Sequence, residues 1–374
     1  MTLPLPELFR SRTTESLGTS EAERLFAALD NGESPVSIRF NPYKIGSQPE
    51  GRQVPWCRYG YYLDERPQFT LDPAFHGGAY YVQEASSMFL EAIFRQIFEP
   101  DAAPRILDLC AAPGGKTTLL STLAGAEGLV VANEVIRQRA SVLAANAVKW
   151  GIGNIVVTNN DPAHFAPFEH YFDLIAVDAP CSGEGMFRKD PAARTEWSEQ
   201  GVKLCAARQR RILSDIWGSL RPGGILIYST CTFNAAENEE NIAWLCGEYD
   251  CEPVEIAVDP SWGVVKGEMD GINTFRFYPH RVKGEGFFAA VIRKSDGRRR
   301  IHALREGQRH RLRLLPGSVR SRPADFRESD GHPFGHSRRT ALRREIQTRT
   351  CVGPVPRRIA RNGSAGRVRP AADS

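Results

Sequence analysis

Between residues 105 and 231 the apolar positions of the chain follow two alternating patterns. Short continuous apolar runs are separated by longer stretches in which apolar residues recur every three or four positions. The first pattern is typical of buried strands and the second of amphipathic helices. Strands are expected at residues 105–110, 128–135, 154–161, 172–180 and 223–231. Because strands alternate with helices, the sequence predicts an α/β fold with a parallel sheet wound on both faces.

The pattern changes on either side of this core. Residues 274–294 contain two further apolar runs joined by a glycine-containing loop, which predicts two antiparallel strands at the sheet edge. Residues 1–78 combine a capped helix, a strand and an aromatic stretch, which predicts a small α+β domain. We therefore expect an N-terminal domain over residues 1–78 and a doubly wound, mostly parallel, seven-stranded sheet over residues 79–295.

An aromatic stretch at residues 56–69 is the most unusual part of the N-terminal domain. Its rings and guanidinium groups could stack on bases and bind phosphates. The residues concerned are Trp56, Arg58, Tyr59, Tyr61, Tyr62 and Arg66. The alternative is a packed small domain in which the same rings are ordinary core anchors. Residue types alone favour neither interpretation.

Charge divides the chain near residue 296. Residues 1–296 contain 28 basic and 38 acidic side chains, a net charge of −10, whereas residues 297–374 contain 20 Arg, no Lys and 6 acidic side chains, a net charge of +14. Only 14 of those last 78 residues are Leu, Ile, Val or Phe, which is too few to bury a core. Residues 296–374 are therefore expected to form a disordered Arg-rich tail, either an arm that contacts RNA phosphates or an out-of-frame remnant.

The cysteines and the N-terminus limit the class of protein further. The eight cysteines are scattered without CxxC pairs, which indicates neither a zinc site nor a disulfide framework. The first residues lack the apolar segment of a signal peptide, and no run of roughly 18 apolar residues could span a bilayer. We expect a cytoplasmic protein that acts as a monomer, with no metal and no membrane partner.

A glycine-rich turn, DLCAAPGGKTT at residues 108–118, lies where the first core strand ends and the next helix begins. Gly114 and Gly115 let the backbone approach a ligand and present amide donors at the helix N-terminus. The turn matches neither the dinucleotide fingerprint nor the phosphate-binding loop, so a nicotinamide-dependent oxidoreductase is a weak rival. A cofactor that carries a carboxylate and ribose hydroxyls fits better.

Three acidic residues follow successive strands of the expected sheet. Glu134 is placed to bind ribose hydroxyls, and Asp161 and Asp178 come at the ends of the third and fourth strands. A strand-end acid is often only a solvated cap. Open α/β sheets, however, bind ligands along the carboxyl edge on which all three would lie. The sequence therefore predicts a row of cofactor-binding acids at this edge.

Cys181 and Cys231 each follow an apolar strand directly, in the segments VDAPCSGEGMFRKDP and IYSTCTFNAAENEEN. The small polar residues around them provide an exposed environment in which a thiolate can form, which suggests covalent catalysis. Lys116, Arg188 and Lys189 could supply the positive field that lowers a thiol pKa, or bind phosphate. A charged pair such as Arg188 and Lys189 is more often simply solvated.

These segments, with NEVIRQRA, NNDP and FRFYPHRVKGEGFF, resemble the NOL1/NOP2/Sun family of RNA 5-methylcytosine methyltransferases, above all its bacterial branch that modifies 16S ribosomal RNA. The resemblance covers roughly residues 1–295. It implies a Rossmann-like S-adenosylmethionine-dependent methyltransferase core, a small N-terminal RNA-contacting domain, and ribosomal RNA or the small ribosomal subunit as partner. Members of this branch usually continue into a further RNA-binding module, where this chain has its Arg-rich tail.

The resemblance also implies roles for the motif residues. Cys231 would be the nucleophile that attacks a cytosine, and Cys181 would assist release of the product. The cofactor-binding residues would be Cys110, Ala111, Ala112, Pro113, Gly114, Gly115, Lys116, Glu134, Asp161 and Asp178. Arg188 and Lys189 are candidate RNA contacts. A non-catalytic RNA-binding assembly factor, or a methyltransferase of transfer RNA or 23S ribosomal RNA, remain alternatives.

Overall fold

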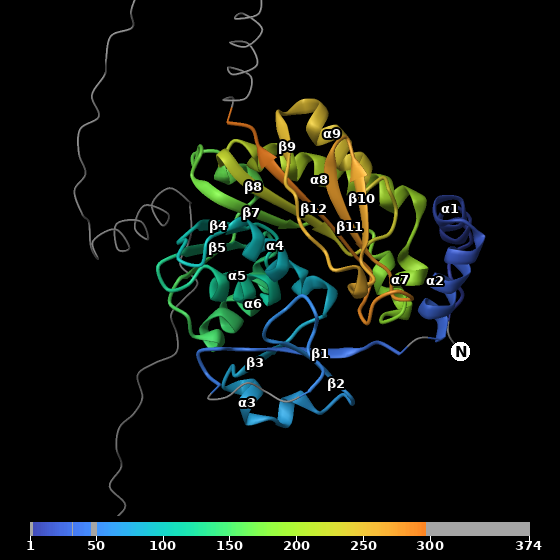
Figure 1. Cartoon of the computed structure of the whole chain (residues 1–374), viewed down its shortest axis with the longest axis horizontal. Coiled ribbons are helices and arrows are strands. Elements are labelled where there is room, and N and C mark those ends of the chain that lie inside the picture. Colours follow the sequence, from blue (N-terminus) through green and yellow to red (C-terminus); the bar gives the residue numbers. More distant parts are fainter. Residues whose placement is uncertain (1–2, 32, 46–50, 297–374) are drawn as a thin grey trace, which may run out of the picture.

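The computed structural model describes residues 3–31, 33–45 and 51–296 (Figure 1). Apart from residue 296, the Arg-rich tail lies outside the described residues, and so do the expectations about it.

A nine-stranded sheet forms the centre of the molecule, in the order β10-β11-β12-β8-β7-β4-β5-β6, with β9 paired to β12. Its parallel part corresponds to the five apolar runs of the sequence. These strands are β4 (Arg105–Asp108), β5 (Leu129–Asn133), β6 (Ile155–Thr158), β7 (Phe172–Asp178) and β8 (Leu220–Thr230). The structure thus confirms the expected α/β fold.

The antiparallel edge is larger than expected. β11 (Ile272–Phe277) and β12 (Phe287–Lys294) form the predicted antiparallel pair, and β12 is also antiparallel to β8. β9 (Cys251–Pro253) and β10 (Val265–Met269) raise the total from the seven expected strands to nine. Neither additional strand carries a continuous apolar run, because β9 has only three residues and the middle of β10 is exposed.

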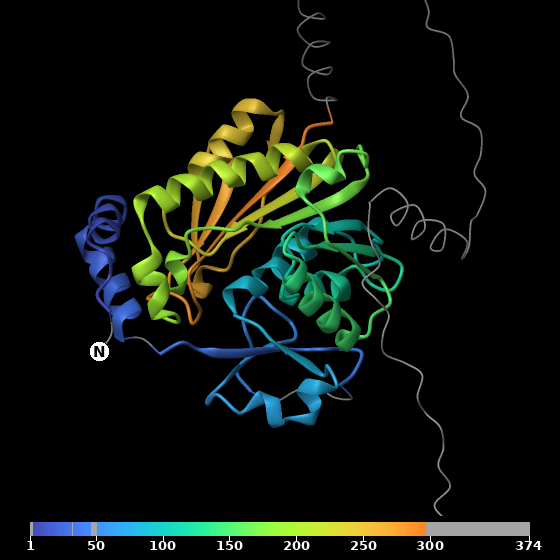
Figure 2. The same cartoon turned by 180° about the vertical axis from the view of Figure 1, so that it is seen from behind.

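Helices cover both faces of the sheet, and alternate residues of each strand point to opposite faces. Ile106 packs in the core beneath α4 and α5, whereas its neighbour Leu107 packs in the core beneath α8 and α9. Figure 2 shows the long helix α8 crossing one face of the sheet. The helices are α4 (Leu90–Ile97), α5 (Gly115–Leu123), α6 (Arg137–Trp150), α7 (Pro191–Glu196), α8 (Glu199–Trp217) and α9 (Glu239–Glu248).

The N-terminal region consists of two separate parts (Figure 1). One is the helix pair α1 (Glu7–Leu17) and α2 (Thr19–Asn31), whose apolar side chains pack with Phe187 and Phe233 of the large domain. The other is a small antiparallel sheet in the order β2-β1-β3, with the short helix α3 (Pro73–His76) beside it. Its strands are β1 (Val36–Phe40), β2 (Gly60–Leu63) and β3 (Tyr80–Val82). The small sheet therefore extends past residue 78, the expected end of the N-terminal domain.

The aromatic stretch of the N-terminal region serves mainly as packing. Trp56, Tyr61 and Tyr62 are buried, and the indole nitrogen of Trp56 donates a hydrogen bond to the Ala85 carbonyl at 2.7 Å. Of the six candidate residues, only Arg58 and Arg66 are exposed, and Tyr59 is half-buried. The packing alternative therefore holds for these three rings, which are not free to stack on bases.

No helix among the described residues is long and apolar enough to cross a membrane. Within the same residues, no three His, Cys, Asp or Glu side chains gather closely enough to bind a metal ion.

Candidate active site at the carboxyl edge of the sheet

The glycine-rich turn connects β4 to α5 at the carboxyl edge of the parallel strands. Gly114 has a φ of 116°, in the left-handed region that favours glycine, and a Cβ there would lie 3.2 Å from a methyl carbon of Leu143. α5 begins at the next residue and has no side-chain cap. Its first backbone amides are therefore available to a ligand, as the sequence predicted for this turn.

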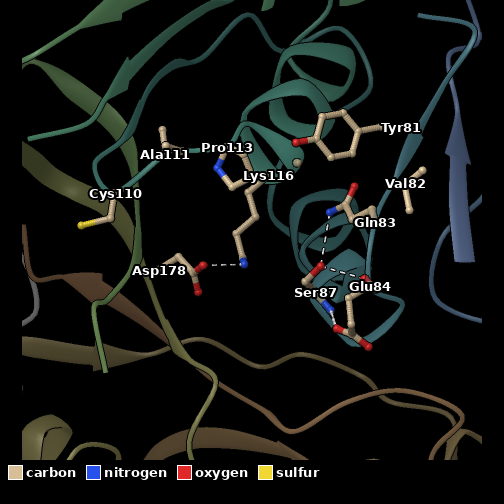
Figure 3. Close-up of a pocket in the computed structure, with 12 residues that line it drawn as sticks. Tyr81, Val82, Gln83, Glu84, Ser87, Cys110, Ala111, Pro113, Lys116 and Asp178 are labelled. Atoms are coloured by element: carbon tan, nitrogen blue, oxygen red, sulfur yellow. Dashed lines mark hydrogen bonds and ion pairs between the residues drawn. The ribbon is translucent and has the colours of Figure 1, made fainter. Parts of the chain in front are cut away.

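A pocket opens between this turn and the N-terminal region (Figure 3). On one side it is lined by residues 110–113, 115 and 116 of the turn, with Asp178 at the end of β7. The opposite wall is the segment that runs from β3 into the helix α4. The residues of that wall are Tyr81, Val82, Gln83, Glu84 and Ser87. None of the five was predicted as a site residue, because only the folded chain brings this segment opposite the turn.

Lys116 is the cation of the pocket, and its Nζ lies 2.8 Å from a carboxylate oxygen of Asp178 (Figure 3). Burial acts to lower the pKa of Lys116, but the carboxylates of Asp178 and Asp108 and the sulfur of Cys231 outweigh it, so the pKa is raised. Lys116 therefore stays charged. It also interacts electrostatically with Cys231.

The two cysteines of the strand-end motifs meet at this edge. The Sγ atoms of Cys181, just beyond β7, and Cys231, just beyond β8, are 3.2 Å apart, and both residues are half-buried. The hydrogen bond to Cys231, together with burial, raises the pKa of Cys181 well above that of a free thiol. The two sulfurs share one hydrogen bond, in which either atom could be the donor.

The three predicted strand-end acids have different surroundings. Glu134 and Asp178 both act electrostatically on Asp108, inside the base of the turn. Glu134 is 2% exposed and accepts a hydrogen bond from the Ile136 amide at 2.9 Å. Asp161 instead caps a short 3₁₀ turn and forms an ion pair with Arg211 of α8 at 3.2 Å.

Arg188 is not available as an RNA contact. Its side chain is 6% exposed and lies 2.9 Å from Glu285, and it also donates to the carbonyl of Gly284 at 2.6 Å. This buried ion pair ties the Cys181 segment to the loop before β12. The expectation for Arg188 is therefore corrected, whereas the neighbouring Lys189 is exposed.

Asp108 makes a testable contribution to the pH dependence of stability. Burial is the largest influence on it and raises its pKa to about 6, while a hydrogen bond from Thr117 opposes this rise. The folded state then binds the proton more tightly than the unfolded chain, so the free energy of unfolding falls as the pH rises from 4 to 6. In Asp108→Asn we expect the fall between pH 4 and pH 7 to be smaller by about 2 kcal/mol. Urea unfolding of both proteins across this range measures it, and parallel profiles would contradict the assignment.

A twisted sheet of this order, with helices on both faces and a glycine-rich turn after β4, has the Rossmann-like fold of S-adenosylmethionine-dependent methyltransferases. The family model "16S rRNA methyltransferase RsmB/F" matches residues 95–293, and that of the "N-terminal domain of 16S rRNA methyltransferase RsmF" matches residues 5–85. The chain belongs to the 16S rRNA methyltransferase RsmB/F family.

Curated relatives carry the name ribosomal RNA small subunit methyltransferase F. The protein of Pectobacterium atrosepticum is 38% identical over 307 residues, which cover 78% of this chain and 63% of the relative. That of Escherichia coli K12 is 36% identical over 314 residues, covering 79% and 64%. The chain thus spans less than two thirds of the length of these relatives.

Solved structures agree on the fold. A methyltransferase homologue from Pyrococcus horikoshii is 30% identical, with a TM-score of 0.64 and coverage of 77% of this chain and 95% of the other. NSun6 from the same organism, solved with SFG, has a TM-score of 0.66 at 21% identity, with coverage of 77% and 98%, and supports the fold alone.

Proposed function

We propose that this chain transfers a methyl group from S-adenosylmethionine to carbon 5 of a cytosine in ribosomal RNA, most simply 16S RNA, through a covalent bond to Cys231. The observation that carries the proposal is the pair of sulfurs 3.2 Å apart at the ends of neighbouring strands, next to the glycine-rich turn. Carbon 5 of cytosine is a weak nucleophile, so its alkylation needs a thiolate that first adds to carbon 6. The family and its curated relatives support 16S RNA as the substrate.

The residues around the turn fit S-adenosylmethionine. Its carboxylate matches the uncapped amides at the start of α5, and its ribose hydroxyls match the Glu134 carboxylate. Asp108 Oδ1 is buried without a hydrogen-bond partner among the described residues, so the site offers an unused acceptor. Residues 110–116, Glu134 and Asp178 would hold the cofactor, which would supply the methyl group of its sulfonium. Asp161 remains a proposal for the same role, although Arg211 neutralises it here.

The steps on the RNA then follow from the chain's own groups. The target cytosine leaves its stack, because its ring cannot be attacked inside a helix. Cys231, as a thiolate beside Lys116, forms a bond to carbon 6, and the displaced electron pair makes carbon 5 nucleophilic. After methylation a base removes the proton from carbon 5. The double bond re-forms, and the carbon–sulfur bond breaks to return Cys231 as a thiolate, a step that Cys181 assists.

RNA contacts are proposed for three exposed cations. Lys189 is exposed in the Cys181 segment, and Arg58 and Arg66 are exposed on the N-terminal region. Cations of this kind bind phosphates and position the strand without reading its sequence.

The experiment that tests the proposed function is methyl transfer from labelled S-adenosylmethionine to 16S RNA by the purified chain. We expect label at carbon 5 of cytosine, found by nucleoside analysis. Transfer RNA and 23S RNA serve as competing substrates, and NAD serves as a control ligand in binding assays. Label in no RNA, or label on another nucleoside, would contradict the proposal.

Glu134 provides a test of the cofactor site. In Glu134→Ala we expect S-adenosylmethionine binding to weaken by about 1–3 kcal/mol, the cost of leaving ribose hydroxyls without a charged acceptor. Isothermal calorimetry measures the change, and thermal unfolding checks that the fold is intact. An affinity equal to that of the unaltered chain would return Glu134 to the role of a strand-end cap.

A further inference from the structure

Two buried carboxylates cross-connect the segments that carry the paired cysteines. Glu184 lies three residues after Cys181, and Glu237 lies six residues after Cys231. Their side chains reach in opposite directions, each to the backbone of the other segment. Glu184 is 2% exposed and Glu237 is fully buried.

Glu184 binds the Cys231 segment. Its Oε2 accepts hydrogen bonds from the backbone amides of Phe233 at 2.8 Å and Asn234 at 2.9 Å. Its Oε1 accepts from the Asn234 side-chain amide and from the indole nitrogen of Trp197, both at 3.1 Å. Two of these four donors are consecutive backbone amides, two and three residues after Cys231. One carboxylate therefore fixes the backbone of the Cys231 segment.

Glu237 binds the Cys181 segment in return. Its Oε2 accepts from the backbone amide of Ser182 at 3.0 Å and from the Gln209 side chain at 2.8 Å. Its Oε1 accepts from the Asn234 side chain at 2.8 Å. Gln209 also donates to the carbonyl of Pro180 at 2.9 Å, so the backbone on both sides of Cys181 is held.

The two backbones also touch directly. The amide of Gly185 donates to the carbonyl of Cys231 at 2.8 Å. A Cβ at Gly185 would lie 2.7 Å from that same oxygen, so any side chain there would push the two segments apart. The separation of the sulfurs is therefore set by a network rather than by the thiols themselves.

The hydrogen-bond donors around each side chain favour a carboxylate over an amide. Among the described residues, the side-chain oxygens of Glu184 accept only from N–H groups, and those of Glu237 accept from N–H groups and from the side chain of Ser182. An amide side chain of the same shape would turn its own NH₂ group toward one of these donors in either orientation. One of the buried donors would then face another N–H group and lack an acceptor, which is destabilising.

We propose that Glu184 and Glu237 are reciprocal positioning residues that hold Cys231 and Cys181 in reacting geometry. This rests on the proposed function, in which Cys231 must meet carbon 6 while Cys181 stays beside the carbon–sulfur bond. Placing two groups on two separate loops requires such a brace, because an error of about 1 Å in the position of a reacting group can slow a reaction on the order of 100-fold.

The test uses Glu184→Gln, with Glu91→Gln as the matched control. Glu91 is also 2% exposed and accepts a buried hydrogen bond from Cys57 and a partly buried one from Arg95, but it lies on α4 and not in either cysteine segment. The first readout needs neither RNA nor cofactor. Diamide oxidises two neighbouring thiols to a disulfide and takes up the two protons and two electrons to become a hydrazine. The rate of disulfide formation therefore reports how often the two Sγ atoms meet. Peptide mapping by mass spectrometry assigns the disulfide.

In Glu184→Gln we expect formation of the Cys181–Cys231 disulfide to slow at least about tenfold and kcat to fall on the order of 100-fold, with S-adenosylmethionine affinity unchanged. Glu91→Gln should leave both rates as they are. Cys246 and Cys251, which hydrogen-bond to each other, give an internal reference for the oxidant in every sample. Glu237→Asp keeps the acceptor and should restore part of the activity that Glu237→Gln loses.

The outcomes separate the two proposals. If the unaltered chain methylates no RNA while the disulfide rates change as expected, the proposed function fails and the brace stands. If Glu184→Gln forms the disulfide as fast as the unaltered chain, or if Glu91→Gln slows it equally, the brace is wrong whatever the activity. Should Glu184→Gln fail to fold, Trp197→Phe removes a single donor and keeps an aromatic side chain, and the same two rates must still fall.

Discussion

Replacing Cys231 by alanine should abolish methyl transfer while leaving S-adenosylmethionine binding intact. The thiol acts on the cytosine and not on the sulfonium, so its loss removes the covalent route without altering the glycine-rich turn. We expect a fall on the order of 10⁶-fold, the scale on which loss of a covalent nucleophile slows an enzyme. Label transfer to 16S RNA and calorimetry of the cofactor measure the two effects.

Cys205→Ala is the matched control for this experiment. Cys205 is a half-buried cysteine on α8, outside the cysteine pair, and its replacement should leave the rate unchanged. Turnover by Cys231→Ala within tenfold of the control would remove the covalent assignment.

Replacing Cys181 by alanine should instead trap the protein on its RNA. Addition and methylation precede the step that Cys181 serves, so the carbon–sulfur bond would form and then persist. We expect most of the protein to migrate as an RNA-linked species on a denaturing gel after incubation with RNA and S-adenosylmethionine. The same gel should show no such species for the double replacement of Cys181 and Cys231, because the adduct needs the nucleophile.

The gel also distinguishes the roles of the two sulfurs. If Cys181→Ala turned over normally with no adduct, the release role would be wrong. If the adduct formed in the double variant, another cysteine would be the nucleophile.

The parallel core was predictable from sequence because its signal is local. Each of β4 to β8 contains a short apolar run next to an amphipathic stretch. Cys231 follows β8 directly, and Cys181 lies three residues after the end of β7. β9 and β10 were not predicted. β9 is too short, and β10 too exposed, to show a periodic apolar pattern. Their pairing is decided by contacts with β12 and β11 that no window of sequence contains.

The site was predictable only in part, because some of its contacts join segments that lie far apart in the sequence. The turn and the cysteines are motifs, whereas the wall formed by the segment after β3 depends on how the small sheet packs against α5. Arg39 shows this packing: from β1 it donates to the Gly115 carbonyl at 3.1 Å and to the Thr118 hydroxyl at 2.6 Å. The burial of Arg188 was not predictable, because a charged residue in a polar loop gives no local sign of its buried partner Glu285.

The central claim is that this chain makes 5-methylcytosine in ribosomal RNA, and bisulfite sequencing of total RNA tests it most directly. Bisulfite converts cytosine but not 5-methylcytosine, so cells with and without the gene are compared at every ribosomal position. We predict at least one cytosine of 16S RNA that resists conversion only when the gene is present, and that becomes convertible when Cys231 is replaced by alanine. Identical conversion patterns in the two cell lines would contradict the account.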